Sequence, residues 1–241
     1  MCGRFTMTDE QLEPLAADLG VPVASLPRIR PRYNIAPTDE HPIARMEFED
    51  PEVILAKWGL INHWIKDPKK ATQVASRQIN ARAESLFERA AYREAIERRR
   101  CIVPADGFFE WSGPKTDRRP YWYHRPDGGL IYFAGLYDFW KPGQVPGTEN
   151  AVDEAHWQPT FTIVTTTPNA LIEPIHDRMP VIIPGGAIDA WLDVRNVPAS
   201  DASKLLVPAP DDLLVARTVS NRVNSVKNDT PDLLIEERAL L

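Results

Sequence analysis

Cys2 is the residue whose chemistry is most distinctive in this sequence. It follows Met1 directly, and a small second residue allows the methionine to be removed. The new terminus would carry an amine and a thiol on adjacent carbon atoms. Such a 1,2-aminothiol condenses with an aldehyde to a Schiff base, which the thiol then closes to a five-membered thiazolidine ring. The amine can attack near neutral pH because the pKa of an α-amino group is about 7.7–8.0.

The same terminus supports two other interpretations. In the first, the Cys2 thiolate attacks an acyl group with the free amine as base, as in N-terminal-nucleophile peptidases and amidohydrolases. Removal of Met1 by the chain itself would be the smallest reaction of this kind. In the second, Cys2 is simply a tolerated second residue. Gly3 permits close approach of the backbone to a ligand, which favours a functional role only slightly.

Two polar side chains could move protons. Glu110 lies within the aromatic run 108–111, where neighbouring rings would desolvate the carboxylate and raise its pKa. The alternative is a position on the solvent-exposed face of a half-buried strand. His176 precedes Asp177 and Arg178. An adjacent arginine favours the neutral imidazole that acid–base chemistry needs, although a lone histidine is more often structural.

A basic stretch contains candidates for binding an anion. Residues 66–119 carry 13 Lys and Arg against 8 Asp and Glu, a net charge of +5, whereas the rest of the chain carries −11. Asn80 and Arg82 alternate in an extended segment, so both side chains can face one site. Nearby His63 and Trp64 add aromatic rings, and arginine with aromatic residues is the combination that binds single-stranded nucleic acid. A solvated helix face and surface salt bridges are the alternatives.

The composition excludes several classes of protein. The chain has 241 residues, a net charge of −6 and two cysteines, too few for a disulfide framework. It contains no CxxC or HExxH spacing for a metal, no glycine-rich phosphate loop and no GxSxG motif. We therefore expect no metal and no cofactor. No apolar run reaches the roughly 20 residues of a membrane span. The start of the chain lacks a signal-peptide core, so we expect a cytoplasmic protein without membrane association.

The elements that must position these groups are mostly strands. Helical periodicity and capping residues predict helices over 9–19, 83–99 and 187–192. β-Branched and aromatic runs bounded by proline or glycine predict strands over 53–58, 101–103, 108–111, 121–124, 130–137, 161–167, 181–183 and 213–219. Because these strands do not alternate with helices, we expect an α+β fold with a mostly antiparallel, barrel-like sheet and peripheral helices. Residues 141–159 are expected to form a surface loop, Cys101 a buried strand position, and Trp58 and Trp111 part of the core.

Several blocks occur together in an order that is specific to one family. They read MCGRF (1–5), YNIAPT (33–38), WGLI (58–61), NARAE (80–84), RCIVPADGFFEW (100–111), FAGLY (133–137), HDRMP (176–180) and VSNRVN (219–224) with KN (227–228). This arrangement resembles the SOS-response-associated peptidase (SRAP) family over nearly the whole chain. The resemblance implies a single compact domain over residues 1–241 with its core at about 2–228. It also implies recognition of abasic sites in single-stranded DNA, shielded by a thiazolidine crosslink.

The resemblance also implies roles for individual residues. Cys2 would be the nucleophile, Asn80 would position its amine or the sugar, Glu110 would be the acid–base group, and His176 would move protons at the opened sugar. The expected DNA contacts are Arg4, Asn34, Pro37, Trp64, Arg82 and Arg178. Near Trp64 the sequence departs from the family pattern, because Asn62 stands where family members commonly carry proline.

Three further expectations accompany these roles. The crosslink would be reversible, and a Schiff base beside an acid–base group could also drive β-elimination, an abasic-site lyase activity. We expect a monomer, because a site at the chain terminus needs no partner. An N-terminal-nucleophile hydrolase and a non-catalytic single-stranded DNA-binding module remain the alternatives.

Overall fold

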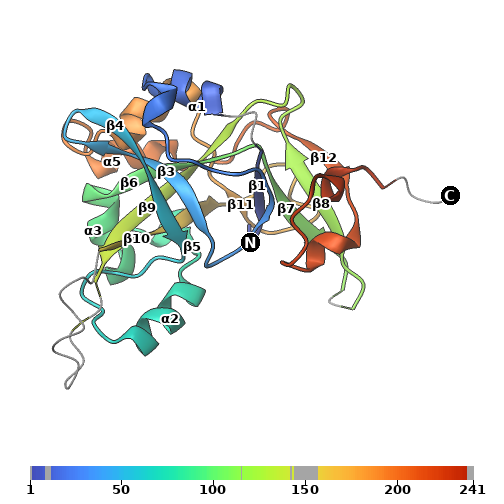
Figure 1. The fold of residues 1–241 in the computed structure, drawn as a ribbon, viewed down its shortest axis with the longest axis horizontal. Helices are drawn as coiled ribbons and strands as arrows, with labels where there is room; N and C mark the ends of the chain where they lie inside the picture. The colour runs from blue at the N-terminus through green and yellow to red at the C-terminus, as the bar shows by residue number, and fades with distance from the viewer. Residues whose placement is uncertain (1, 9–11, 115, 142, 144–156, 238–241) are drawn as a thin grey trace.

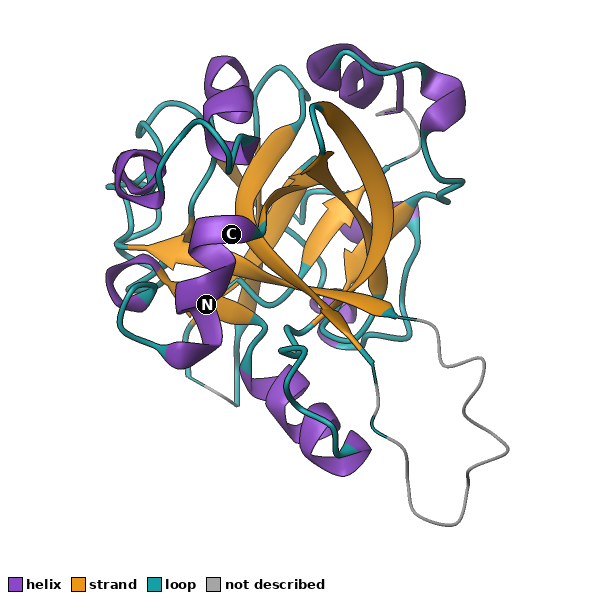
Figure 2. Ribbon diagram, turned by 90° about the vertical axis from the view of Figure 1, so that its left-hand side faces the viewer, coloured by secondary structure: helices purple, strands orange, loops and turns teal. Residues whose placement is uncertain are grey.

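The core of the fold is a closed β-barrel, seen in a computed structural model that describes residues 2–8, 12–114, 116–141, 143 and 157–237. Its strands follow the order β10 (Gln158–Thr166), β4 (Asp50–Trp58), β3 (Glu40–Glu47), β6 (Arg100–Ala105) and β9 (Ile131–Trp140), and β9 pairs back onto β10. All but the β4–β10 contact in this circuit are antiparallel. The predicted antiparallel, barrel-like core is therefore confirmed. Figure 2 shows the strands curving round the barrel, with the helices at its periphery.

A second sheet lies beside the barrel. It has the order β12 (Val215–Thr218), β8 (Arg119–His124), β7 (Gly107–Ser112), β1 (Phe5–Met7) and β2 (Arg32–Ile35). In Figure 1 the barrel fills the left half of the view, β7, β8 and β12 fill the right half, and β1 lies between them. The barrel also carries two short strands on β10, namely β11 (Met179–Pro180), which is antiparallel, and β5 (Asn80–Arg82), which is parallel. The extended conformation predicted for Asn80 and Arg82 is confirmed.

The helices are short and lie around the outside of the two sheets (Figure 1 and Figure 2). The α-helices are α1 (Leu12–Leu19), α2 (Pro68–Arg77), α3 (Ala90–Arg98), α4 (Ile188–Leu192) and α5 (Ala199–Ala202). The 3-10 helices are η2 (Val23–Ser25), η3 (Ala83–Ser85), η4 (Gly185–Ala187), η5 (Ser203–Leu205), η6 (Asn221–Asn224) and η7 (Pro231–Leu234). None of the described helices is long and apolar enough to cross a membrane.

The prediction of one helix over 83–99 is wrong. Only Ala90–Arg98 is α-helical, after the 3-10 turn at Ala83–Ser85, because Arg89 adopts an extended conformation in front of the helix. Leu86 and Ile96 are both buried and produced the periodic signal, but they belong to separate elements, and Phe87 is exposed. The turn at 83–85 directs the chain out of β5 and so determines where Asn80 and Arg82 lie.

Other boundaries also differ from the prediction. Helix α2 went unrecognised because only Ala71 and Ala75 are buried on it, although Asp67 accepts the backbone N–H of Lys69 as an N-cap at 2.8 Å. The strand expected at 181–183 is instead β11 at Met179–Pro180, and Ile182 forms a single bridge to Phe133. Strands β1, β2 and β3 were not predicted. Residues 9–11 of the first predicted helix and most of the expected 141–159 loop lie outside the described residues.

Cys101 lies inside the barrel, as expected. It is fully buried on β6 opposite Gly135 of β9. A Cβ atom at Gly135 would come within 2.7 Å of the Cys101 sulfur, so this close approach of the two strands requires glycine. Cys101 therefore fills core volume, and burial raises the pKa of its thiol far above the ordinary range. Of the two cysteines, only Cys2 lies next to a carboxylate and an open cleft.

Candidate functional site

The N-terminal segment is held against β7, which carries Glu110. Phe5 pairs with Phe108 in antiparallel register, and the Phe109 amide donates to the carbonyl oxygen of Arg4 at 3.0 Å. This register brings Cys2 close to Glu110. Cys2 is fully buried, and burial raises the pKa of its thiol, an effect that the charge of Glu110 reinforces. The thiol is therefore protonated at neutral pH and needs a base before its sulfur can attack.

Asn80 fixes the backbone of Cys2 from the opposite side. Its side-chain amide donates to the carbonyl oxygen of Cys2 at 2.9 Å. The parallel pairing of β5 with β10, in which Asn80 lies opposite Ile163, holds this side chain in place. The side-chain oxygen of Asn80 is also buried and accepts no hydrogen bond within the part of the chain that the structure describes. An unpaired buried acceptor is costly, so this atom is poised for a donor from a ligand or from the chain terminus.

A cleft of about 640 Å³ opens in front of these residues. Its lining combines charged, aromatic and amide side chains: Gly3, Arg4, Glu110, Trp111, Thr116, Asp117, Arg118, His176, Asn221 and Asn224. Glu110 is buried at the floor of the cleft, and burial raises the pKa of its carboxyl group above the ordinary 4.5. A carboxyl group in this state can hold a proton at a higher pH than an exposed one and release it during a reaction.

His176 lies in the same cleft, and its pKa is shifted in the opposite direction from that of Glu110. Burial lowers its pKa below the ordinary 6.5. Its Nδ1 atom accepts the backbone N–H of Arg178 at 3.0 Å, which leaves the proton of the neutral ring on Nε2. Asp177 also approaches Nδ1 at 2.9 Å, but its side chain is 82% exposed and solvent screens its charge. The cleft thus pairs a carboxyl group of raised pKa with an imidazole of lowered pKa, as acid–base sites do.

Arg4 and Asn34 are joined to each other and to the 223–228 loop. Arg4 donates to the side-chain oxygen of Asn34 at 2.8 Å and to the carbonyl of Val223 at 3.0 Å. The Asn34 amide contacts the carbonyl oxygens of Val223, Ser225 and Asn228 at 3.1, 3.1 and 2.8 Å. Asn34 is 1% exposed. In this structure, therefore, Asn34 holds Arg4 and one wall of the cleft together and presents no free surface to DNA.

Arg178 and Arg82 differ in how available they are. The guanidinium of Arg178 is largely buried and forms two hydrogen bonds to Glu84, at 2.7 and 2.9 Å, and one to the Thr165 carbonyl at 2.5 Å. To bind a phosphate, the Arg178 guanidinium must break its hydrogen bonds to Glu84 or divide its N–H donors between Glu84 and the phosphate. Arg82 is exposed and lies on the same face of β5 as Asn80. Arg82 is not among the residues that line the cleft, and its expected contact with DNA remains a prediction.

Pro37 and Trp64 do not line this cleft. Pro37 lies in a turn closed by a hydrogen bond from Asp39 to the Ala36 carbonyl, and it is half-buried. Trp64 is 45% exposed and meets His63 edge to face at 4.9 Å. Their expected contacts with DNA remain predictions.

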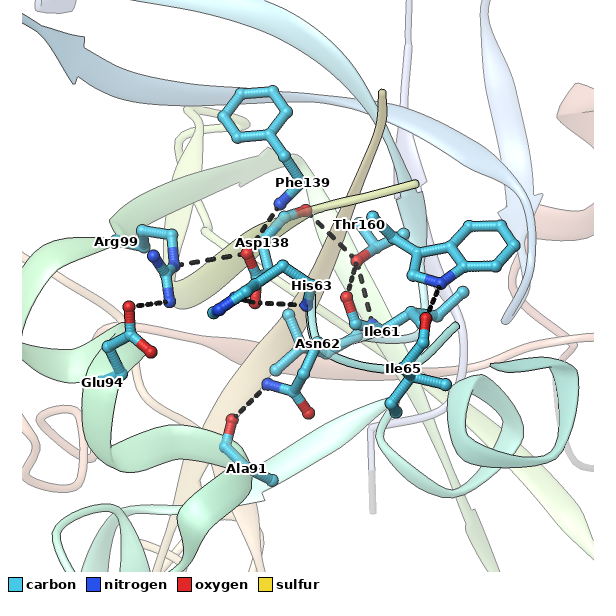
Figure 3. A network of polar contacts seen from close by, with 12 residues as sticks. Ile61, Asn62, His63, Ile65, Ala91, Glu94, Arg99, Asp138, Phe139 and Thr160 are labelled. Atoms are coloured by element: carbon cyan, nitrogen blue, oxygen red, sulfur yellow. Dashed lines mark hydrogen bonds and ion pairs between the residues drawn. The ribbon is translucent and has the colours of Figure 1, made fainter. Parts of the chain in front are cut away.

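A buried polar network determines the shape of the loop before Trp64. In Figure 3 the His63 ring points toward Asp138, whose carboxylate accepts both the ring Nδ1–H and the backbone N–H of His63 at 3.0 Å. Asn62 donates to the Ala91 carbonyl at 2.8 Å. Hydrogen bonds to α3 and β9 therefore hold the backbone of this loop in place.

Sequence reasoning missed several residues that line the cleft. Trp111 was expected in the core, but it is only half-buried and donates its indole N–H to the Asn224 side chain at 2.7 Å. Trp58, by contrast, is fully buried as expected. Thr116, Asp117 and Arg118 also line the cleft, and the net positive charge of residues 66–119 was the only signal that pointed toward them. No group of three metal-ligating side chains occurs among the described residues.

Comparison with known proteins gives consistent matches over the whole chain. The family described as "SOS response associated peptidase (SRAP)" matches residues 1–226. The abasic site processing protein YoqW of Bacillus subtilis is 36% identical over 239 residues, covering 97% of this chain and 99% of that protein. The abasic site processing protein HMCES of Gallus gallus is 32% identical over 238 residues, covering 86% and 67%. A crystal structure of a protein from Bacteroides thetaiotaomicron matches with a TM-score of 0.82 at 25% identity, covering 98% and 100%.

Proposed function

The chain belongs to the SOS response associated peptidase family, and on this premise we propose that it recognises abasic sites in single-stranded DNA and bonds covalently to them through Cys2. The observation that carries the proposal is the position of Cys2, held by Asn80 and beside Glu110, which lines a cleft together with Gly3 and His176. The relatives named for abasic site processing support the choice of substrate. An abasic site in equilibrium with its ring-opened form supplies the aldehyde that an aminothiol attacks.

The first step is hydrolysis of the Met1–Cys2 peptide bond, which consumes one water and frees the Cys2 amine. The neutral amine then attacks the aldehyde carbon of the opened sugar. Glu110 donates its proton to the hydroxyl group of the resulting carbinolamine, which leaves as water and yields the Schiff base. The raised pKa of Glu110 suits this step, because the carboxyl group must still hold a proton at a pH where part of the amine is neutral.

The second step closes the ring. The Glu110 carboxylate left by the first step takes the proton from the Cys2 thiol, and the sulfur attacks the imine carbon. The proton stays on Glu110, which regains its acid form, while the nitrogen keeps the N–H of the protonated Schiff base, so the overall change is aldehyde plus aminothiol to thiazolidine plus water. Burial disfavours a free thiolate at Cys2, so the thiol is deprotonated only when an imine is next to it. This order suppresses oxidation and other side reactions of the sulfur.

The remaining groups assist at the sugar and the phosphates. The buried side-chain oxygen of Asn80 accepts an N–H of the Cys2 amine and orients its lone pair toward the aldehyde. Neutral His176, with its proton on Nε2, exchanges a proton with the sugar hydroxyl group as the ring opens and, in reversal, as it closes. Arg82 contacts a phosphate. Arg4 and Arg178 do so once they release their hydrogen bonds to Asn34 and Glu84, respectively. β-Elimination from the Schiff base competes with ring closure and would appear as slow strand cleavage. All these groups come from one copy of the chain.

The test uses purified protein and a single-stranded oligonucleotide with one abasic site. We expect an adduct that survives denaturing electrophoresis, is absent with an intact strand, and is lost in Cys2→Ala. Cys101→Ala is the matched control, since it removes the other thiol and leaves the adduct in place. Intact-mass spectrometry should show that the reactive protein lacks Met1. Full retention of Met1 in reactive protein, equal retention of intact and abasic strands, or glutamine hydrolysis without an adduct would overturn the proposal.

A further inference from the structure

Arg118 occupies a defined position at the edge of the cleft. It ends the connection between β7 and β8, directly before β8 begins at Arg119. The Asp117 amide closes a turn on the Pro114 carbonyl at 2.9 Å. Gly113 begins the connection at a φ of +90°, and a Cβ there would lie 2.8 Å from the Asp117 carbonyl oxygen, so only glycine permits this turn. The turn places Arg118 among the residues that line the cleft with Glu110 and His176.

The guanidinium of Arg118 differs from those of Arg4 and Arg178. Arg4 is bound to Asn34 and the Val223 carbonyl, and Arg178 is bound to Glu84 and the Thr165 carbonyl. Arg118 is exposed and makes no side-chain hydrogen bond or ion pair to any residue that the structure describes. Binding an anion therefore requires Arg118 to give up only water, whereas Arg178 must also leave a carboxylate.

Arg118 also lies close to both reacting groups. Burial is the largest influence on both pKa values, raising that of Glu110 and lowering that of His176. The positive charge of Arg118 is a smaller influence that lowers both. Asp117 lines the same cleft, so the local field is mixed and not uniformly basic. A cation within electrostatic reach of the acid and the imidazole is also within reach of the phosphates that flank a sugar bound between them. Arginine matches a phosphate with two parallel N–H donors.

We propose that Arg118 binds the DNA phosphate next to the abasic sugar. This inference rests on the proposed function for the identity of the anion. It adds to the expected phosphate contacts a residue on the β7–β8 connection, and this contact forms with less rearrangement of the free protein than a contact by Arg4 or Arg178 needs. Arg118 acts by holding the strand so that the aldehyde faces Cys2, and it takes no part in bond formation.

The experiment compares Arg118→Gln with Arg119→Gln. Both remove one exposed charge from neighbouring residues, but Arg119 does not line the cleft. The probe is a single-stranded oligonucleotide with one tetrahydrofuran residue, an abasic analogue without an aldehyde, and binding is measured by fluorescence anisotropy at several salt concentrations. Arg118→Gln should weaken binding roughly tenfold and lower the slope of log affinity against log salt by about 0.7. Arg119→Gln should keep a slope near wild type.

Two further measurements exclude a structural effect. Arg118→Lys should restore most of the salt slope because it restores the charge, while thermal melting should be unchanged in all three variants. With a true abasic strand, Arg118→Gln should raise the DNA concentration for half-maximal adduct formation more than it lowers the rate at saturation. Equal slopes in Arg118→Gln and Arg119→Gln would refute this inference even if the adduct forms normally. If wild type forms no adduct through Cys2 but Arg118→Gln still weakens binding of the tetrahydrofuran strand and lowers its salt slope, only the proposed function is refuted.

Discussion

The side chain of Asn80 and the backbone of Cys2 are joined by a hydrogen bond of 2.9 Å, which links the barrel to the chain terminus. Asn80 is held by β5 against β10, whereas Cys2 precedes β1 of the second sheet. The bond therefore ties together the two sheets at the position of the nucleophile. Its effect is to restrict the terminus to one orientation before substrate arrives, which lowers the entropic cost of reaching the reactive geometry.

Asn80→Ala should slow adduct formation at saturating abasic DNA without preventing it. The net contribution of one hydrogen bond is about 0.5–1.5 kcal/mol, so we expect a decrease of roughly two- to tenfold. Asn80→Asp should decrease the rate more, because its carboxylate repels the Cys2 carbonyl and stabilises the protonated, non-nucleophilic amine. Single-turnover gels measure both rates. A wild-type rate in Asn80→Ala would show that the contact does not position the terminus.

Glu110→Gln should reduce the rate of adduct formation roughly 100-fold or more, because general acid–base groups contribute at least that much. It should also change the pH dependence of stability. Burial raises the pKa of Glu110 in the folded protein above the ordinary 4.5 of the unfolded chain. Its favourable contribution to folding is therefore fully present below pH 4.5 and is lost as the pH rises through the raised pKa.

The melting temperature of wild type should therefore fall relative to that of Glu110→Gln as the pH increases from 4 to 8. Differential scanning fluorimetry at matched ionic strength measures this difference. A difference that is constant with pH would mean that Glu110 ionises in the fold as it does in the unfolded chain. The acid proposed for the dehydration step would then lack the property on which its role depends.

Asn34→Ala should destabilise the fold by roughly 2–3 kcal/mol, since it removes several buried hydrogen bonds worth about 1 kcal/mol each. It should also loosen Arg4 and the 223–228 loop, and so weaken binding of the tetrahydrofuran strand. Asn196→Ala, which removes one exposed asparagine bonded to Asp193, is the control and should be near neutral. Chemical denaturation and anisotropy provide the two measurements. Normal stability in Asn34→Ala would contradict the central position assigned to its side chain.

Glu84→Gln should strengthen binding of single-stranded DNA and steepen its salt dependence. Glu84 is 53% exposed and holds both Nη atoms of the buried Arg178. Removing its charge breaks the ion pair, leaves Arg178 with Thr165 as its neighbouring acceptor and makes the guanidinium more available to a phosphate. Glu88→Gln removes a similar exposed charge without this partnership and should have a smaller effect. Unchanged binding in Glu84→Gln would indicate that Arg178 is a structural residue and never meets DNA.

The strands of the fold were predictable where a run of residue types by itself indicates a strand. The runs that became β4, β7, β8, β9 and β10 are rich in β-branched and aromatic residues, and their close spacing predicted the antiparallel barrel. The prediction failed where apolar spacing continued across a backbone break. Leu86 and Ile96 share a helical period, but Arg89 is extended between them. Helix α2 was missed because its capping residues, not its buried face, define it.

The sequence by itself determined which chemistry is available. A cysteine after the initiator methionine, a glutamate among aromatic residues and a histidine beside an arginine are facts of residue type, and the ordered blocks identified the family. Only the tertiary structure decided which of these groups meet and which charges are free. Cys2 meets Asn80 and Glu110, and Glu110 shares a cleft with His176, because non-local strand pairing brings their segments together. Arg178 is paired with Glu84, whereas Arg118 has no such partner among the described residues, because ion pairing depends on distance in space and not on separation along the chain.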